Sequence, residues 1–317
     1  MTTTADTISP SPLSPPNRKR FNRMTFWRNA EGWLFASPWI LGFILWTAGP
    51  MIASLFIAFT EWDLVTAPEW VGFENISRMF NDKLVWKALR VTSVYAFVSV
   101  PLHLVFGMAL ALLLNANIRG LRWYRTAFYL PSVLSGVAVA LLWRWLFSGE
   151  FGLFNAMLSY VGIDGPSWLG DPQWALRSLI VMSLWGVGAG AIIYLAGLQG
   201  IPTDLYEAAE VDGARGWDRL WNVTIPMMTP VLFFQLVTGL IAALQVFTQA
   251  FIMTNGGPNH STLFFLLYLY QNAFNYWKMG YASALAWILF IYILILTLIM
   301  QFTSNRWVYY EGEEQKA

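Results

Sequence analysis

The chain has 317 residues, of which 57% are apolar and only 12% are charged. This composition lies outside the range of soluble globular domains and favours a protein that crosses a membrane several times. The formal net charge of +1 says nothing by itself about nucleic acid, which is not an expected partner. The absence of cysteine excludes disulfides, thiolate metal sites and cysteine nucleophiles.

Residues 1–32 open the chain with a stretch rich in serine and proline, from Ser9 to Pro16, followed by several basic side chains. Such a segment cannot build a core, so we expect a disordered, basic N-terminal tail. The apolar run that follows is far longer than the core of a cleavable signal peptide. We therefore interpret it as the first spanning helix.

Six apolar runs near the ~20 residues needed to cross a bilayer follow in order. They cover Trp33–Phe59, Val91–Leu114, Thr126–Phe147, Leu179–Leu198, Pro230–Met253 and Ala282–Phe302. Together they predict an all-α membrane protein with a domain of six transmembrane helices over 33–303 and a C-terminal tail at 304–317. The shorter run Thr262–Phe274 is interrupted by Gln271 and Asn272, so it is more typical of an interfacial or re-entrant segment than of a seventh span.

Lysine and arginine predict the orientation of these spans, because basic residues concentrate on the cytoplasmic side. With six spans the two termini share a side. That side carries Arg18, Lys19, Arg20, Arg23, Arg28, Arg119, Arg122, Arg125, Arg215, Arg219, Arg306 and Lys316. The opposite side carries fewer, at Arg78, Lys83, Lys87, Arg90, Arg177 and Lys278. Both termini are therefore predicted to be cytoplasmic.

The longest polar segment between two runs includes Tyr206 to Trp217 and lies between the fourth and fifth runs, on the predicted cytoplasmic side. Its pattern predicts two short amphipathic helices. Asp204 is the expected N-cap of the first, and Gly213 is its expected stop in a left-handed conformation. Pro226 is expected to end the second. Neither helix is long enough to cross a bilayer, so the segment must lie at a surface.

Several kinds of chemistry lack their residues in this sequence. No lysine follows a glycine, so the Gly-Lys-Ser/Thr ending of a P-loop is missing, and ATP binding through such a loop is not expected. His103 and His260 are far apart and show no metal-ligand spacing. We expect no catalytic residue, no metal and no cofactor. His103, midway along the second run, is interpreted as a hydrogen-bonded packing residue in preference to a proton relay.

The polar segment also carries a resemblance to a known family. Glu207-Ala208-Ala209, then Gly213, then Val223-Thr224-Ile225-Pro226 resemble the EAA motif of permease subunits in binding-protein-dependent ABC importers, E-A-A-x3-G-x9-I-x-L-P. The spacing matches throughout, while Val223 and Ile225 replace the isoleucine and leucine of the motif. Trp70–Asn75, Leu130-Pro131 and Thr254–Pro258 are similar to the carbohydrate branch, of the maltose and glycerol-phosphate type. The alternative is an ordinary interfacial loop.

The resemblance implies the type I importer permease fold and a coupling helix that docks on a cytoplasmic ATPase. The residues it assigns to ATPase coupling are Glu207, Ala208, Ala209, Asp212, Gly213 and Arg215. The loop at Gly256, Gly257 and Pro258 would face an extracytoplasmic solute-binding protein. The implied complex also contains a second homologous permease and two ATP-binding subunits. It would lie in the bilayer of a bacterial or archaeal cytoplasmic (inner) membrane.

A substrate pathway is expected along the fifth run, which is unusually polar for a span. Thr238, Ala242, Gln245 and Gln249 share a helical face that could line a cavity of the size of a sugar, with the amides bound to hydroxyl groups. Alternatively, these groups hold neighbouring helices together. The resemblance adds Trp185 and Gly188 to the pathway. Counting from the EAA motif points instead to Gly239, Ala242, Ala243 and Val246.

The predicted function is that of a permease subunit that translocates a carbohydrate or related solute, powered by ATP hydrolysis in a separate subunit. The alternative is a secondary transporter driven by an ion gradient. Such a transporter needs carboxylates within its spans, and the six runs contain no Asp or Glu. A membrane-embedded enzyme would need clustered His, Asp or Glu residues, which the sequence does not show.

Overall fold

The structure, a computed structural model, describes residues 23–116 and 119–309. The chain divides into two compact units, with the boundary between Ala53 and Ser54. Residues 1–22 and 310–317, which hold most of the two predicted tails, lie outside the described residues.

The first unit is helical. Helix α1 (Arg23–Phe43) leads through a π-helical turn, η1 (Ile44–Ala48), into α2 (Gly49–Ile57). The segment Glu31–Ile57 is long and apolar enough to cross a membrane. Helix α1 already begins at Arg23, before the predicted boundary at residue 33. The proline-rich stretch ends at Pro16, so no proline opposes helix formation between Arg23 and Gly32.

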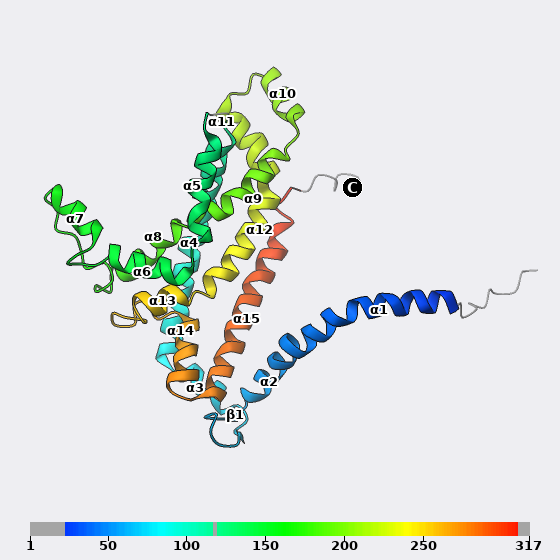
Figure 1. Ribbon diagram of the computed structural model, residues 1–317, viewed down its shortest axis with the longest axis vertical. Coiled ribbons are helices and arrows are strands. Elements are labelled where there is room, and N and C mark those ends of the chain that lie inside the picture. Colours follow the sequence, from blue (N-terminus) through cyan, green and yellow to red (C-terminus); the bar gives the residue numbers. More distant parts are fainter. Residues whose placement is uncertain (1–22, 117–118, 310–317) are drawn as a thin grey trace, which may run out of the picture. The chain divides into compact units, whose positions relative to one another are not determined.

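The second unit begins at Ser54, within α2, and continues through a short antiparallel hairpin into helices (Figure 1). In the hairpin Thr60 pairs with Trp70 and Glu61 with Glu69. The elements in order are β1 (Thr60–Glu61), β2 (Glu69–Trp70), α3 (Glu74–Asn81), α4 (Lys83–Asn115), α5 (Leu121–Val133), α6 (Gly136–Leu146), α7 (Leu153–Tyr160), α8 (Ala175–Leu184), α9 (Val187–Gln199), α10 (Thr203–Val211), α11 (Gly216–Arg219), the π-helical turn η2 (Leu220–Thr224), α12 (Ile225–Leu244), α13 (Thr248–Met253), α14 (Phe265–Tyr270), the π-helical turn η3 (Gln271–Asn275) and α15 (Met279–Ser304).

Six stretches of the described chain could cross a membrane, and each contains most or all of one predicted run. Four are long apolar helices: Glu31–Ile57, Lys83–Asn115, Gly216–Met253 and Met279–Ser304. The other two are bent helix pairs, α5 with α6 and α8 with α9. The all-α prediction with six spans is therefore confirmed. The run Thr262–Phe274 holds only the short α14 and most of η3, and it is not among these stretches.

Two predicted spans are not straight helices. Helices α5 and α6 meet at 98°, and α8 and α9 at 43°. The first break falls where Leu134 takes an extended backbone conformation with ψ near 144°. The predicted span Thr126–Phe147 is therefore a bent pair of helices, because an apolar run records burial or lipid contact but not the direction of the backbone.

Two π-helical turns precede prolines in the spans. Turn η1 lies just before Pro50 and turn η2 just before Pro226. A proline within a helix lacks an N–H donor and its ring clashes with the carbonyl four residues earlier. In the π turns the next N–H reaches back five residues, from Gly49 to Ile44 O and from Ile225 to Leu220 O. This wider turn lets both helices continue through their prolines.

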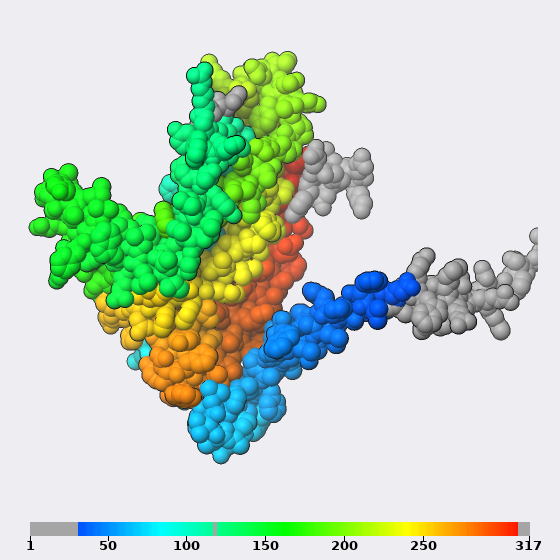
Figure 2. Space-filling view, viewed as in Figure 1, coloured from blue at the N-terminus to red at the C-terminus, as the bar shows by residue number. Residues whose placement is uncertain are grey.

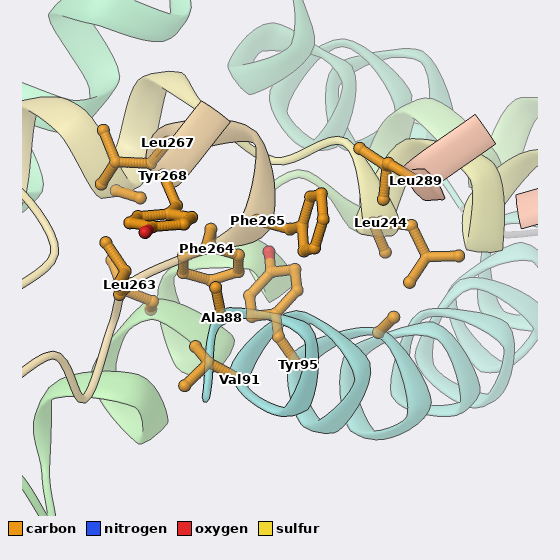
Figure 3. Packing of buried hydrophobic residues seen from close by; sticks show 14 of the residues in the cluster. Ala88, Val91, Tyr95, Leu244, Leu263, Phe264, Phe265, Leu267, Tyr268 and Leu289 are labelled. Carbon is orange, nitrogen blue, oxygen red and sulfur yellow. The ribbon is translucent and has the colours of Figure 1, made fainter. Parts of the chain in front are cut away.

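The core of the second unit is built around the short α14, which packs on α4 (Figure 3). Phe264 and Phe265 are fully buried, and the ring of Phe264 meets Tyr95 of α4 edge to face, with 5.1 Å between centroids. The Phe265 N–H donates to the buried Thr92 hydroxyl at 2.8 Å. This bond satisfies a buried amide and joins two segments that are far apart in sequence.

Small residues allow the spanning helices to pack closely against one another. Helix α4 packs mainly against α9 and α12. Gly107 of α4 faces the Tyr194 ring of α9, and a Cβ there would lie 2.7 Å from the ring. Because lipid tails are as apolar as leucine side chains, close packing of this kind, more than burial from water, holds membrane helices together.

Candidate functional site

The EAA segment forms a hinged pair of helices at the end of the second unit opposite α3 (Figure 1). Helix α10 begins at Thr203, directly after Pro202. The prediction that Asp204 is the N-cap is wrong, because Asp204 lies inside the first turn. Pro202 stands at the cap instead, and its carbonyl accepts from the Leu205 N–H at 3.3 Å.

Gly213 ends α10 as the sequence predicts. Its φ is +83°, a left-handed conformation that glycine adopts without strain. The Gly213 N–H donates to Glu210 O at 3.0 Å, and the Ala214 N–H donates to Ala209 O at 2.9 Å. These two bonds form a Schellman motif, which satisfies the last carbonyl groups of the helix.

The second helix of the pair is continuous with a span. From Gly216, α11, η2, α12 and α13 form one stretch of 38 residues that ends at Met253. The prediction that Pro226 ends this helix is wrong, since the π turn η2 carries the backbone through the proline. The second helix of the pair is therefore the first part of a spanning helix, while α10 is a separate helix before it.

Helix α10 is also fastened to this long helix through its side chains. The Tyr206 hydroxyl lies 3.0 Å from the Thr224 hydroxyl, which in turn donates to Arg219 O at 3.3 Å. Thr224 is buried, and Tyr206 packs on a buried cluster that includes Met228 and Tyr194. A force on α10 is therefore transmitted to α12 through a packed and hydrogen-bonded contact.

The outer face of α10 is exposed and mixed in character (Figure 2, yellow-green). Leu205, Ala208 and Val211 present apolar surface, with Val211 88% exposed. Among the described residues, Glu207 has no hydrogen-bond or ion-pair partner. Glu210 pairs with Arg219 at 3.2 Å. This surface suits a partner that covers small apolar groups and offers basic side chains at the rim.

The other coupling residues from the sequence lie in the same unit. Ala209 is half-buried, and Asp212 and Arg215 are exposed on either side of the Gly213 turn. The Arg215 N–H donates to the Asp218 carboxylate at 2.9 Å, which satisfies the first turn of α11. The structure thus brings all the predicted coupling residues together on one short unit.

A cavity of about 560 Å³ lies within the spans, between α4, α8, α9 and α12. This volume is within the range of about 300–1,000 Å³ that is usual for small-molecule sites. Its polar lining includes Ser99, His103, Ser183, Gln235, Thr238 and Gln249. Hydroxyl and amide groups of this kind can both donate to and accept from the hydroxyl groups of a polar solute.

The structure divides the predicted pathway residues between different places. Thr238, Ala242 and Gln249 line the cavity, as do Gly239, Ala243 and Val246, the residues found by counting from the EAA motif. Gln245 is exposed and is not part of the lining. The backbone leaves the helix between α12 and α13, at Gln245, so the four-residue spacing of a continuous helix does not hold there.

Trp185 and Gly188 lie away from this cavity. They line a second depression, of about 590 Å³, together with Phe106, Phe128 and Pro131. A Cβ on Gly188 would lie only 1.8 Å from Phe128 O. Gly188 thus allows α9 to pack directly against the backbone of α5.

Three polar residues of the cavity lining were not predicted to belong to it from the sequence. Ser99 and His103 come from α4, and Ser183 from the end of α8. Ser99 and His103 are four residues apart, on one face of an otherwise apolar span. This four-residue spacing places both polar side chains on one side of the helix and could have indicated that this side faces a cavity.

The loop at Gly256–Pro258 is held in place by its own hydrogen bonds. The Gly257 N–H donates to Thr254 O at 2.9 Å, and the buried Thr262 hydroxyl donates to Gly257 O at 2.6 Å. Lys87, near the start of α4, donates to Asn259 O at 2.6 Å. The loop therefore has a defined shape at the end of the unit away from α10 (Figure 1).

Asp82 ties three helices together at that same end. It caps α4 by accepting from the Leu84 N–H at 2.9 Å, and it accepts from the hydroxyls of Tyr268 and Tyr281. Burial alone would raise the pKa of this carboxyl, but these hydrogen bonds and the nearby Arg78 hold the pKa below its ordinary value of 3.8. Its stabilising contribution is complete above the ordinary pKa and is lost as the pH falls through the lowered one.

Residues 103–308 match the family described as the binding-protein-dependent transport system inner membrane component. The chain is 47% identical over 292 residues to the probable ABC transporter permease protein YesP of Bacillus subtilis (strain 168), covering 90% of this chain and 94% of that protein. It is 34% identical over 286 residues to the lactose transport system permease protein LacF of Rhizobium radiobacter, covering 88% and 95%.

A solved structure has the same fold. One chain of a bacterial alginate ABC transporter, crystallised with its alginate pentasaccharide-bound periplasmic protein, superposes with a TM-score of 0.79. The sequences are 26% identical, and the match covers 89% of this chain and 96% of that one.

Proposed function

Because the chain belongs to the family of inner membrane components of binding-protein-dependent transport systems, we propose that it passes a carbohydrate through the cavity between α4, α8, α9 and α12. The chain is a permease subunit of an ABC importer with the type I permease fold, and not an enzyme or a secondary transporter. Its partners include a solute-binding protein. The choice of a carbohydrate is supported by the lactose and alginate systems among its relatives.

The proposed mechanism depends on one helix that is shared by the EAA unit and the cavity wall. The helix that begins in the EAA unit at Gly216 is the helix whose later residues, Gln235 and Thr238, line the cavity. An ATP-binding subunit that moves α10 would therefore displace one wall of the cavity directly. Such a rigid-body movement alternates access to the cavity between the two sides of the membrane.

The surfaces at the two ends of the spans have different proposed partners. The coupling surface of Glu207, Ala208, Ala209, Asp212, Gly213 and Arg215 meets an ATP-binding subunit in the cytoplasm. The loop at Gly256–Pro258 faces the solute-binding protein. A second permease and two ATP-binding subunits complete the complex, with both termini of this chain in the cytoplasm. The membrane domain corresponds to 33–303.

Cross-linking tests the proposed ATP-binding partner. The chain has no cysteine, so Ala208→Cys introduces a single attachment point for a photoreactive thiol reagent. Since Ala208 is exposed on α10, the labelled variant is expected to capture the ATP-binding subunit in the assembled complex, with a yield that changes when ATP is added.

Ser77→Cys is the matched control, on the exposed face of α3 at the other end of the unit. It should capture no ATP-binding subunit. Equal capture from both positions, or none from Ala208→Cys in an assembled complex, would contradict the proposed docking surface.

A further inference from the structure

A depression of about 500 Å³ lies between the first turns of α4 and the start of α8, outside the central cavity. Its lining residues are Trp86, Lys87, Arg90, Val91 and Val94 of α4 and Leu176 of α8. From Lys87 to Val94 the spacing is three, four and seven residues, so these side chains share one side of α4. We call this feature the α4–α8 depression.

The two parts of the α4–α8 depression differ in chemistry. Lys87 and Arg90 bring two positive charges to the part nearest the start of α4. Val91, Val94 and Leu176 make the part further along the span apolar. Among the described residues that line it there is no Asp or Glu. The depression therefore suits a ligand with an anionic end and an apolar end.

Both positive charges are available to such a ligand. Arg90 is exposed and has no hydrogen-bond or ion-pair partner among the described residues. Lys87 donates to Asn259 O at 2.6 Å, which leaves two of its three N–H groups. Asp82, the nearest carboxylate before them on the chain, already accepts three hydrogen bonds and forms no ion pair with either.

The depression lies at the level where phospholipid headgroups meet the spans. Helix α4 has 33 residues, which makes it about 50 Å long and longer than the ~30 Å hydrocarbon core. Its apolar run begins at Val91, so Lys87 and Arg90 lie in the turn just outside the core. Trp86 is 51% exposed beside them, and tryptophan is typical of this interface.

We propose that the α4–α8 depression binds a phospholipid with an anionic headgroup. The phosphate contacts the Lys87 ammonium and the Arg90 guanidinium, whose N–H groups match phosphate oxygens. One acyl chain lies along Val91, Val94 and Leu176. A zwitterionic headgroup binds less well, because its own cation would face the two basic side chains. The proposal does not depend on which solute the chain transports.

Quenching by brominated lipids measures the occupancy of the depression. The chain has no cysteine, so Val98→Cys gives it a single site for a fluorophore, in a complex whose partner subunits also lack cysteine. Val98 is exposed and lies one turn beyond Val94. In phosphatidylcholine nanodiscs, phosphatidylglycerol with brominated acyl chains is expected to quench at an at least fivefold lower mole fraction than brominated phosphatidylcholine.

Two substitutions on α4 separate the proposed site from general attraction between charges. Arg90→Gln and Lys83→Gln each remove one exposed positive charge, and Arg90 has no contact within the described chain that its loss would break. Lys83 lies outside the depression, about 10 Å before Arg90 along the helix, where salt screens its charge. Arg90→Gln should lower the preference for phosphatidylglycerol about fivefold, and Lys83→Gln should leave it unchanged.

The position of the fluorophore has its own control. A label at Ile291→Cys, on the exposed part of α15 and outside the depression, should be quenched equally by the two brominated lipids. Equal quenching at Val98→Cys would overturn the proposal, as would a preference that persists in Arg90→Gln. Quenching by neither lipid would show that a partner subunit covers the depression, which also overturns it.

A last arm distinguishes a lipid from free phosphate, since both offer the same oxygens to Lys87 and Arg90. Inorganic phosphate is added to the wild-type complex while chloride keeps the ionic strength constant. The preference for phosphatidylglycerol should persist, because phosphate alone gains nothing from the apolar part of the depression. Loss of the preference would assign the two basic residues to free phosphate and overturn the lipid site.

Discussion

Replacing Gly213 with proline is expected to lower solute-stimulated ATP hydrolysis and transport at least tenfold. Gly213 has φ of +83°, whereas proline is restricted to φ near about −65° and has no N–H to donate to Glu210 O. The Schellman turn would open, and α10 would lose its direction relative to α11. Because the turn is exposed, the spans should still fold and assemble.

Gly216→Ala is the matched control for this substitution. Gly216 is the first residue of α11, and a Cβ there would meet nothing within 4 Å. Its transport and ATP hydrolysis should equal those of the wild type. Glu207→Lys tests the same surface without touching the turn, because Glu207 is exposed, and it should also reduce coupling. Normal coupling in an assembled Gly213→Pro complex would contradict the proposed role of α10 and the Gly213 turn in ATPase coupling.

Replacing Gln249 with leucine is expected to raise the transport KM about tenfold with little change in protein stability. Gln249 lines the cavity from α13, and its amide can bind a sugar hydroxyl through both its oxygen and its nitrogen. Leaving a substrate hydroxyl unpaired costs about 1–3 kcal/mol, and about 1.4 kcal/mol corresponds to a factor of ten in affinity. Uptake at several solute concentrations measures the change.

Gln301→Leu is the control for this variant, since Gln301 is an exposed glutamine near the end of α15 and is not part of the cavity lining. It should leave the KM unchanged. If both variants, or neither, raise the KM, then the cavity between α4 and α12 is not the solute pathway.

The sequence predicts the spans well because hydropathy is a local property. The six apolar runs recur in the structure, as does the stop at Gly213, where a left-handed residue is needed and glycine supplies it. The direction of the backbone is not local. The 98° break after Val133 and the continuous helix through Pro226 both depend on packing and on a π turn, neither of which has a hydropathy signature.

The cavity residues also differ in whether local sequence spacing predicts them. Thr238 and Ala242 follow from helical spacing. Gln245 leaves the lining because α12 ends before it, and Gln249 lines the cavity from the next helix, α13. His103 and Ser183 come from different spans and meet only in the folded chain. Helical spacing within one run could not pair them.

In the proposed function, ATP hydrolysis in another subunit drives a solute through this chain. Uptake of labelled solute into proteoliposomes that hold the complete complex, with the solute-binding protein outside, tests it most directly. Uptake is expected to require ATP inside the vesicles, to persist when ionophores collapse all ion gradients, and to stop in Gly213→Pro. Uptake that proceeds without ATP and follows an imposed ion gradient would contradict it.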